Sequence, residues 1–448
     1  IDPLPFPSPS LSLFSLVVSL PLLPMPALFQ AHSLPSFPSV LGSPMVLTAA
    51  LSFLLSLLPS ITFIVCPFLA IFAALYIPLP SALSDKNKLY PVELFVRLTG
   101  EYAGELVEMI AGPEVRNSYA RLVMGFSFHL PFSLPAGIEY DWIEIAGVPV
   151  RLMRPAKREE RREMPVVYIH GGGWATMKPN YYDFCLGFLV RKLGCTIFAV
   201  GYRLAPEHPF PAGLDDCEAV VRALDSDKLR EFGLSADKLV LMGDSAGGNL
   251  TAVTTRRLRD DNKIKCQVLI YPVTSVFSFS FPSYREYFTE YPGTALLNPY
   301  SMARWILFYV GLDAHVGNVK KLIRGEHIPR NYSKLLDNVQ NEFEKASDKF
   351  FPDQRLTTAF AKRGLDPDVS PLYAPDLKGL PPTMVLTAGI DVLRDEGQAY
   401  ARRLASEGVV VDDKHYPTAY HGIMNMPYSS VRKQMQNDIV AFLEKHAT

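Results

Sequence analysis

A serine lies between two glycines in the sequence GDSAG at residues 243–247. In the pattern G-x-S-x-G, the glycines allow a tight turn from a strand into a helix, and this turn exposes the serine hydroxyl. An apolar run at residues 238–242 precedes the motif and a helix-like run at residues 249–259 follows it. Because this context distinguishes the motif from a chance match, we predict that Ser245 is the nucleophile of an acyl-transfer reaction.

Three successive glycines follow another short apolar run. The sequence HGGGW at residues 170–174 comes directly after the run at residues 166–169. Glycines let main-chain amides approach a substrate oxygen closely, and each such donor stabilises a transition state by roughly 3 kcal/mol. A flexible linker is disfavoured directly after a buried strand, and the phosphate-binding patterns GxxxxGK[ST] and GxGxxG are absent from the sequence. His170 and Gly171 support the motif, and the predicted oxyanion donors are the amides of Gly172, Gly173 and Ala246.

An aspartate and a histidine are the predicted partners of the serine. Asp391 follows the apolar run MVLTAGI, and His421 follows the run VVVDDKHYPTAY. A serine needs an imidazole to remove its proton, and the imidazole needs a carboxylate to fix its tautomer. The chain order Ser, Asp, His fits a serine on a strand-to-helix turn. Rival candidates are weaker, because they precede the serine or fall within a predicted helix or strand: His208, Asp395, Glu396 and His415.

The composition excludes several classes of protein. The 448 residues include 44 Lys plus Arg and 45 Asp plus Glu, so a net charge of −1 gives no electrostatic footprint for nucleic acid. Five cysteines without a CxxC pair make neither a disulfide framework nor a structural zinc site. The sequence leaves open whether Cys185, Cys195, Cys217 and Cys266 pair or stay free. We expect no metal and no organic cofactor.

The elements that must position these side chains alternate along the chain. Residues 142–153 are typical of a hairpin that turns at Ala146-Gly147. Buried strands that alternate with helices predict a mostly parallel sheet covered on both faces. The predicted strands are residues 166–169, 196–200, 238–242, 268–271, 384–387 and 409–414. The predicted helices between them are residues 181–193, 214–224, 249–259 and 398–406.

Two further regions are expected to cover one end of the sheet. Residues 85–128 have a helical pattern, and residues 273–381 are too many for one loop and contain a helical run at 301–310. The second region is rich in aromatic residues, which either line an acyl pocket or a membrane-facing mouth, or pack the core of this region itself. They are Phe277, Phe279, Phe281, Tyr284, Tyr287, Phe288 and Tyr291.

The first part of the chain has no charged residue from Pro3 to Ser84. Residues 1–44 are rich in Pro, Ser and Leu, and frequent prolines forbid a continuous helix, so we predict either a disordered extension or a segment that is not part of the working protein. Residues 45–77 are apolar, and the 18 residues from Ser60 to Ile77 nearly span a bilayer as a helix. We predict an uncleaved anchor there rather than a cleaved signal peptide, because no small-residue cleavage site stands out before Pro78.

Five motifs together resemble one family. They are HGGGW, YRLAPE at 202–207, GDSAGGNL, DVLR at 391–394 and YHG at 420–422. The chain resembles the hormone-sensitive-lipase group of α/β-hydrolases, in its arylacetamide deacetylase and neutral cholesterol ester hydrolase branch. The resemblance implies an α/β-hydrolase fold with a mostly parallel central sheet, helices on both faces and a helical cap. It also implies a triad of Ser245, Asp391 and His421, with Gly172, Gly173 and Ala246 as oxyanion donors.

The resemblance covers roughly residues 70–448 and also implies a location, whereas residues 1–44 have no counterpart in the family. We expect an extension at 1–44, an anchor at 45–80, an N-terminal helical cap region at 81–139, and a catalytic domain at 140–448 with a cap insertion at about 274–380. A single-pass anchor in the endoplasmic reticulum membrane with a lumenal catalytic domain agrees with the glycosylation pattern at Asn331. Lys86 and Lys88 after the apolar segment favour the opposite orientation.

The expected function is hydrolysis of lipid or aryl-acyl esters by a membrane-anchored serine esterase, with a small ester and the bilayer as partners. Cleavage of aryl amides uses the same three side chains and is the first alternative. A non-catalytic ligand receptor on the same fold is the second, but it predicts a missing triad residue, and none is missing from the sequence.

Overall fold

The computed structural model describes residue 52 and residues 75–128, 134–261, 263–294, 296–328, 352–427 and 429–447. It divides into two units, Ile1–Ile77 and Pro78–Thr448, and the second is described below. The predicted extension at 1–44, most of the predicted anchor at 45–80 and the glycosylation pattern at Asn331 lie outside the described residues. Among the helices that are described, none has both the length and the apolar composition needed to cross a membrane.

One eight-stranded sheet forms the centre of the described part of Pro78–Thr448, with the strand order β1-β2-β4-β3-β5-β6-β7-β8. The first two strands form an antiparallel hairpin, and β2 also runs antiparallel to β4, whereas all the other neighbours are parallel. The strands are β1 (Ile138–Ile145), β2 (Val148–Pro155), β3 (Pro165–Ile169), β4 (Thr196–Val200), β5 (Val240–Asp244), β6 (Cys266–Ile270), β7 (Thr383–Ile390) and β8 (Val411–Tyr420).

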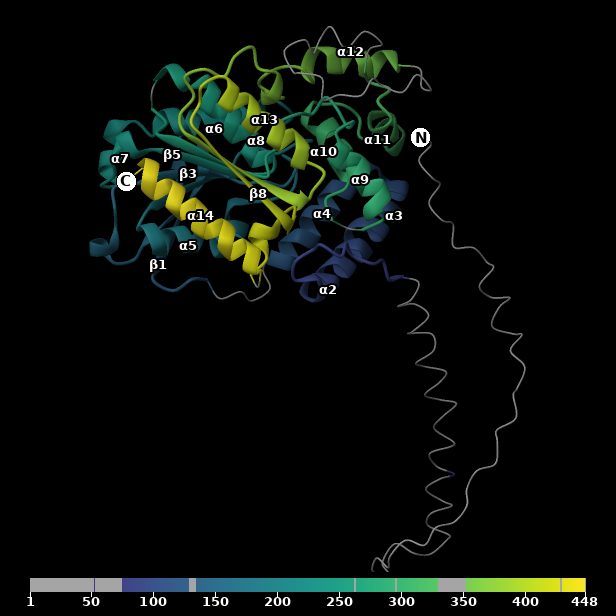
Figure 1. Ribbon diagram of the computed structural model, residues 1–448, viewed down its shortest axis with the longest axis horizontal. Helices are drawn as coiled ribbons and strands as arrows, with labels where there is room; N and C mark the ends of the chain where they lie inside the picture. Colours follow the sequence, from purple (N-terminus) through teal and green to yellow (C-terminus); the bar gives the residue numbers. More distant parts are fainter. Residues whose placement is uncertain are drawn as a thin grey trace, which may run out of the picture. The chain divides into compact units, whose positions relative to one another are not determined.

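The apolar runs of the sequence are buried on both faces of this sheet. Every residue of β3, β4, β5 and β6 is buried, because helices cover both sides. Figure 1 shows α5 (Asp183–Leu193) and α14 (Ser430–Ala447) on one side of the sheet, and α6 (Ala212–Ala223), α8 (Ala246–Arg257) and α13 (Arg394–Ser406) on the other. The predicted α/β fold is therefore confirmed. A short helix, α7 (Ser226–Glu231), also precedes β5.

Several strands differ in extent from the sequence prediction, and two of these differences bear on the site. β5 begins at Val240 and ends at Asp244, two residues later than predicted, so Ser245 follows the strand without a spacer. β8 continues to Tyr420, beyond the predicted end at Lys414, because its pairing with β7 resumes after a β-bulge and Ile390 pairs with Tyr420. Both differences bring a predicted site residue to the carboxyl edge of the sheet.

Helices from two distant parts of the chain gather at the same end of the sheet (Figure 1). The first group is α2 (Lys86–Val96), the π-helical turn η2 (Arg97–Tyr102), α3 (Ala103–Ala111) and α4 (Pro113–Phe128). The second lies between β6 and β7 and comprises α9 (Pro282–Glu290), α10 (Pro299–Tyr309), α11 (Val316–Ile323) and α12 (Gln354–Arg363). A buried ion pair of 2.8 Å from Arg304 Nη2 to Glu108 Oε2 joins α10 to α3, so the two groups form one cap.

The aromatic residues of the second group pack against one another. Phe279 and Tyr284 make an edge contact at 5.0 Å between ring centroids, and Tyr287 makes similar contacts with its neighbours. Of the two interpretations of this aromatic set, the structure favours the core of the cap. Six of the seven are buried: Phe277, Phe279, Phe281, Tyr284, Tyr287 and Tyr291. The cysteines at 185, 195, 217 and 266 are also buried, and all four are free.

Candidate active site

The turn between β5 and α8 holds Ser245 in a conformation that few residues adopt. Its backbone angles are φ 56° and ψ −123°, in a region that is strained for a residue with a Cβ atom. The amide of Ser245 donates to Ile270 O at 2.9 Å, and its carbonyl accepts from the amide of Val273 at 3.2 Å. Hydrogen bonds to the end of β6 and to the loop that follows it therefore hold the turn in place.

The two glycines of the motif are required by close packing rather than by flexibility. A Cβ atom on Gly243 would lie 2.4 Å from the carbonyl oxygen of Gly247, and one on Gly247 would lie 2.0 Å from the carbonyl oxygen of Ile169. Both distances are far below van der Waals contact. Only glycine allows the start of α8 to approach β3 and β5 this closely.

Two successive hydrogen-bonding contacts link Ser245 to His421 and His421 to Asp391. The Oγ of Ser245 is 2.9 Å from Nε2 of His421, and Nδ1 of His421 is 2.8 Å from Oδ2 of Asp391. The three residues follow β5, β8 and β7 directly. Parallel strands end at a common edge, which is how residues 176 positions apart meet.

The hydrogen bonds fix the roles of the histidine nitrogens. A carboxylate has no proton to donate, so Nδ1 donates to Asp391 and Nε2 is left to accept from the hydroxyl of Ser245. The carboxylate of Asp391 is fully buried and its other oxygen accepts the amide of Leu393 at 2.9 Å. The arrangement is able to take a proton from Ser245 and to stabilise the imidazolium that forms.

The glycine loop after β3 lies beside the serine turn, since a Cβ atom on Gly171 would lie 3.0 Å from the Cβ atom of Ser245. Gly172 and Gly173 have φ values of +99° and +60°, which residues with a Cβ atom rarely adopt. Among the hydrogen bonds of the described residues, none uses the amides of Gly172, Gly173 or Ala246 as donors. Free amides on this loop and at the first turn of α8 are suited to hold an oxyanion.

A buried carboxylate that sequence reasoning missed ties the glycine loop to the serine turn. Asp244, the last residue of β5, accepts hydrogen bonds from the Tyr168 hydroxyl at 2.7 Å, the Gly171 amide at 2.8 Å and the Tyr182 hydroxyl at 3.1 Å. Burial raises the pKa of Asp244, and the three donors oppose that shift. The sequence could have indicated this role, because a charged residue at the end of a buried strand needs several hydrogen-bond partners.

His170, predicted as a supporting residue, is held as a neutral ring. Burial lowers the pKa of His170 to about 4. Its ring stacks on Tyr202 with 4.4 Å between centroids, and the Tyr202 hydroxyl donates to the His170 carbonyl at 2.8 Å. This places Tyr202 of the YRLAPE motif beneath the glycine loop, where it fixes the path of the backbone.

The rival residues have other contacts. Asp395 and Glu396 fall inside α13, as expected, and His415 lies within β8, where its Nδ1 is 3.0 Å from the Thr387 hydroxyl. His208 is exposed in the loop between β4 and α6. In the hydrogen bonds found for the described residues, none of these four side chains contacts Ser245.

Glu396 has a structural position that its sequence context did not reveal. Its Oε1 accepts from the amides of Thr274 and Ser275 at 2.7 and 3.1 Å, where the chain leaves β6 toward the cap insertion. Burial raises the pKa of Glu396 well above its ordinary value. The residue therefore joins α13 to the base of the insertion.

Both parts of the cap contact the glycine loop. A Cβ atom on Gly173 would lie 2.3 Å from the indole of Trp305 in α10, so that ring rests on the loop. From α4, the Arg121 guanidinium donates to the carbonyls of Ala175 and Ala205 at 2.6 and 2.8 Å. The cap thus restricts the space above the candidate oxyanion donors.

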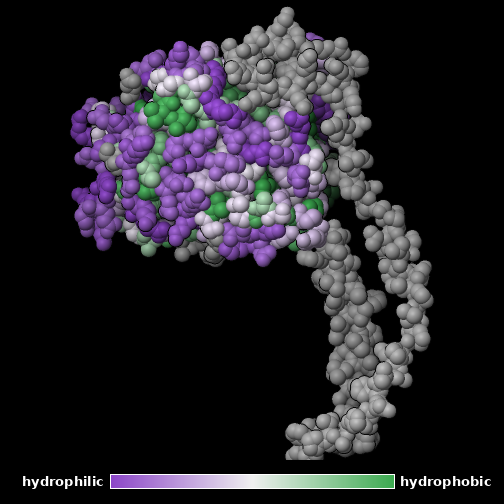
Figure 2. Space-filling model, in the orientation of Figure 1, coloured by the Kyte–Doolittle hydropathy of each residue, from purple (hydrophilic) through white to green (hydrophobic). Residues whose placement is uncertain are grey.

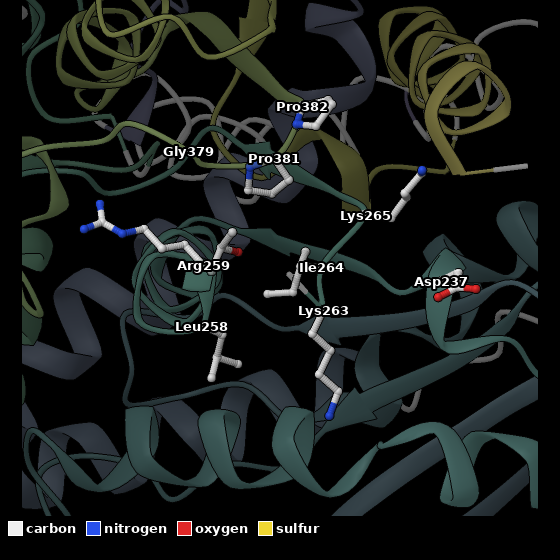
Figure 3. Close-up of a pocket in the computed structure, with 10 residues that line it drawn as sticks. Asp237, Leu258, Arg259, Lys263, Ile264, Lys265, Gly379, Pro381 and Pro382 are labelled. Carbon is white, nitrogen blue, oxygen red and sulfur yellow. The ribbon is translucent and has the colours of Figure 1, made fainter. Parts of the chain in front are cut away.

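Other possible sites lie elsewhere or are not found. A cavity of about 400 Å³ is lined by residues that include Leu258, Lys263, Lys265 and Pro381 (Figure 3). It lies at the amino ends of β6 and β7, the opposite edge of the sheet from Ser245. Within the described ranges, no group of three or more His, Cys, Asp and Glu side chains is arranged to hold a metal ion.

Comparisons with known proteins bear on the fold and on the family. The model of the alpha/beta hydrolase fold family matches residues 166–323 and 338–425. Arylacetamide deacetylase of Bos taurus is 30% identical over 391 residues, which are 83% of this chain and 95% of that protein. Neutral cholesterol ester hydrolase 1 of Rattus norvegicus is 32% identical over 387 residues, 80% of this chain and 92% of that one.

Solved structures give the same fold. An esterase of the archaeon Pyrobaculum calidifontis superimposes with a TM-score of 0.57 at 27% identity. The match covers 77% of this chain and 97% of the esterase. An esterase from the bacterial hormone-sensitive lipase family superimposes with a TM-score of 0.59, over 82% of this chain and 100% of its own. At 22% identity, the second comparison bears on the fold alone.

Proposed function

Since this chain belongs to the alpha/beta hydrolase family, we propose a mechanism for its ester hydrolysis. Within the family it belongs to the group that contains arylacetamide deacetylase and neutral cholesterol ester hydrolase. The chain is an esterase-type hydrolase that acts on small ester substrates. The proposal is that Ser245, His421 and Asp391 form the catalytic triad. The observation that carries it is the 2.9 Å contact between Ser245 Oγ and His421 Nε2, with Asp391 behind the imidazole.

The proposed reaction has two halves. Ser245 Oγ attacks the ester carbonyl while His421 Nε2 takes the hydroxyl proton, and the amides of Gly172, Gly173 and Ala246 hold the oxyanion. When the tetrahedral intermediate collapses, His421 returns the proton to the departing alkoxide and an acyl-serine remains. Water then attacks this acyl-enzyme with His421 as base, the carboxylic acid leaves and Ser245 regains its proton.

The test is the variant Ser245→Ala in the full chain. We expect kcat on a p-nitrophenyl ester to fall by roughly 10⁴-fold or more, because a triad acts as a unit. A fluorophosphonate probe should label the wild type and not the variant. Hydrolysis at the wild-type rate by Ser245→Ala would refute the assignment.

Amide cleavage is the second candidate, since arylacetamide deacetylase is among the relatives. Matched anilide and phenyl-ester substrates with the same acyl group separate the two activities. A non-catalytic receptor, the candidate from another class, is disfavoured by the complete Ser245–His421–Asp391 arrangement. It predicts no labelling by the fluorophosphonate.

The proposed substrates are lipid or aryl-acyl esters, and the proposed location is the endoplasmic reticulum membrane. Residues 45–77 support an anchor by their apolar composition, and the pattern at Asn331 supports a lumenal catalytic domain. Lys86 and Lys88 oppose that orientation. A gel shift on glycosidase treatment that disappears in Asn331→Gln is the expected result, and a wild-type chain without a shift would contradict lumenal placement.

A further inference from the structure

The first helical segment of the cap has exposed apolar side chains on one side and buried charged side chains on the other. From α2 through η2 to α3, apolar side chains point outward along one row. With about 100° per residue, the members of this row fall within an arc of roughly 120°. The outer row consists of Phe95, Leu98, Tyr102, Leu106, Met109 and Ile110.

Three charged side chains of the same helical segment point inward, whereas Lys88 and Glu105 are exposed. Glu93 and Arg97 are buried and form an ion pair at 3.1 Å. Glu108 is 8% exposed and accepts from Arg116 and Arg304 at 2.9 and 2.8 Å. These residues occupy the opposite side of the segment from the outer row. A helix that faced water would place its charges outward and its apolar residues inward.

The side chains of the outer row are more exposed and closer together than the single apolar residues found on most protein surfaces. Met109 and Ile110 are 76% and 75% exposed, and Leu106 is 53% exposed. The adjoining helix α4 adds Leu122 and Phe126, which are also largely exposed. Contiguous apolar surface of this kind marks a contact with a partner or a membrane. On the face drawn in Figure 2, hydrophilic residues predominate and hydrophobic ones form separate spots.

We propose that this outer row lies in the interface of a lipid bilayer. The chain itself indicates that occupant. Residues 45–77 are apolar and without charge, and eight residues separate Ile77 from the start of α2 at Lys86. An extended connection of that length reaches roughly 30 Å at most. With residues 45–77 anchored as proposed, the start of α2 stays within that distance of the bilayer, so the chain itself supplies a bilayer as the occupant.

The consequence concerns how substrate reaches Ser245. The cap that carries the outer row also contacts the glycine loop, through Arg121 of α4 and Trp305 of α10. A cap seated in the interface opens toward the layer in which acyl chains reside. The inference deepens the proposed function and rests on its membrane association, and it assigns to the outer row the uptake of esters dissolved in the bilayer.

The first experiment measures the contact directly. The full chain with Cys66→Ser and Met109→Cys is labelled with an environment-sensitive fluorophore in phosphatidylcholine vesicles, because the other four cysteines are buried. We expect a blue shift and quenching by nitroxide-bearing lipids. The matched control is Val410→Cys, another exposed apolar position at 57%, which should show neither. A label at position 109 that is as exposed to water as the label at position 410 overturns the proposal. A label at position 109 that is shielded from water but not quenched by the nitroxide-bearing lipids also overturns it, and identifies a protein occupant.

The second experiment measures uptake. The triple variant Leu106→Glu, Met109→Glu, Ile110→Glu should lose about tenfold or more in hydrolysis of a long-chain ester held in vesicles, since each lost apolar contact weakens insertion. Hydrolysis of soluble p-nitrophenyl acetate should be unchanged. Equal rates on the vesicle ester would overturn the proposal. The soluble assay with Ser245→Ala tests the chemistry separately, so failure of the outer row and failure of the triad give different results.

Discussion

The carboxylate of Asp244 accepts the amide of Gly171 at 2.8 Å. This bond joins the residue before the proposed nucleophile to the loop that carries two proposed oxyanion donors. The serine turn and the glycine loop come from different strands, β5 and β3. A buried hydrogen-bonded carboxylate between them holds the hydroxyl and the amides in one fixed relation, which is what preorganised catalysis requires.

Asp244 should act as a positioning residue. We predict that Asp244→Ala lowers kcat on a soluble ester by about 10–100-fold and changes KM less, because the amides lose their alignment with the oxyanion. Tyr182→Phe removes one donor to the same carboxylate and should cost less. A folded Asp244→Ala protein, judged by circular dichroism, with the wild-type kcat would contradict the role.

Asp391→Asn should reduce kcat by roughly 10⁴-fold with little effect on folding. The reason is that an amide at this position favours a proton on Nε2 of His421, which then cannot accept from Ser245. Asp395→Asn is the matched control, since Asp395 is the neighbouring carboxylate and contacts Ser283 and Arg394 instead. Steady-state kinetics on both variants decide the assignment, and a larger loss in Asp395→Asn would reverse it.

Glu396 should matter to stability through its hydrogen bonds and not through its charge. Its pKa is raised by burial, so the native carboxyl retains a proton above its ordinary range. Glu396→Gln preserves the acceptor for Thr274 and Ser275 and should change the free energy of unfolding by less than about 1 kcal/mol. Glu396→Ala leaves both amides unpaired and should cost about 2–4 kcal/mol. Urea unfolding measures both, and equal losses would argue against this account.

Acid should destabilise the protein partly through His327. Burial lowers the pKa of His327 to about 4, whereas an unfolded chain binds the proton near pH 6.5. Between these values the unfolded state binds more protons, so the free energy of unfolding falls as the pH falls from about 6.5 to about 4. Below that window both states are protonated and the contribution of His327 is constant.

The variant His327→Gln isolates this contribution. Glutamine keeps a donor for the carbonyl of Phe277, which His327 Nε2 contacts at 2.7 Å. We expect the loss of stability between pH 7.5 and 4.5 to be smaller in the variant by up to about 3 kcal/mol. Chemical unfolding at several pH values provides the comparison. An unchanged pH slope would show that His327 does not titrate in this way.

The sequence determined those features that depend on local patterns. Apolar runs separated by helical stretches predicted the strands β3 to β8, because a strand buried on both faces must be apolar throughout. The triad candidates were found because GDSAG, Asp391 and His421 each follow such a run in the required order. Their proximity in the structure follows from parallel strands ending at one edge. Residues 1–44, most of 45–80 and Asn331 stay predictions, since they lie outside the described residues.

Tertiary structure alone decided the features that depend on contacts between distant elements. Asp244 and Glu396 are one and five residues from triad members along the chain, yet their partners Tyr168, Tyr182, Thr274 and Ser275 come from other elements. The aromatic residues of the insertion are compatible with a pocket or a core until their ring contacts are known. Likewise Glu108 of α3 pairs inward with Arg116 and Arg304, which places the apolar outer row on the other side of that helix. A side chain's residue type sets what it can bind, but its partner is set by packing across the sheet and the cap.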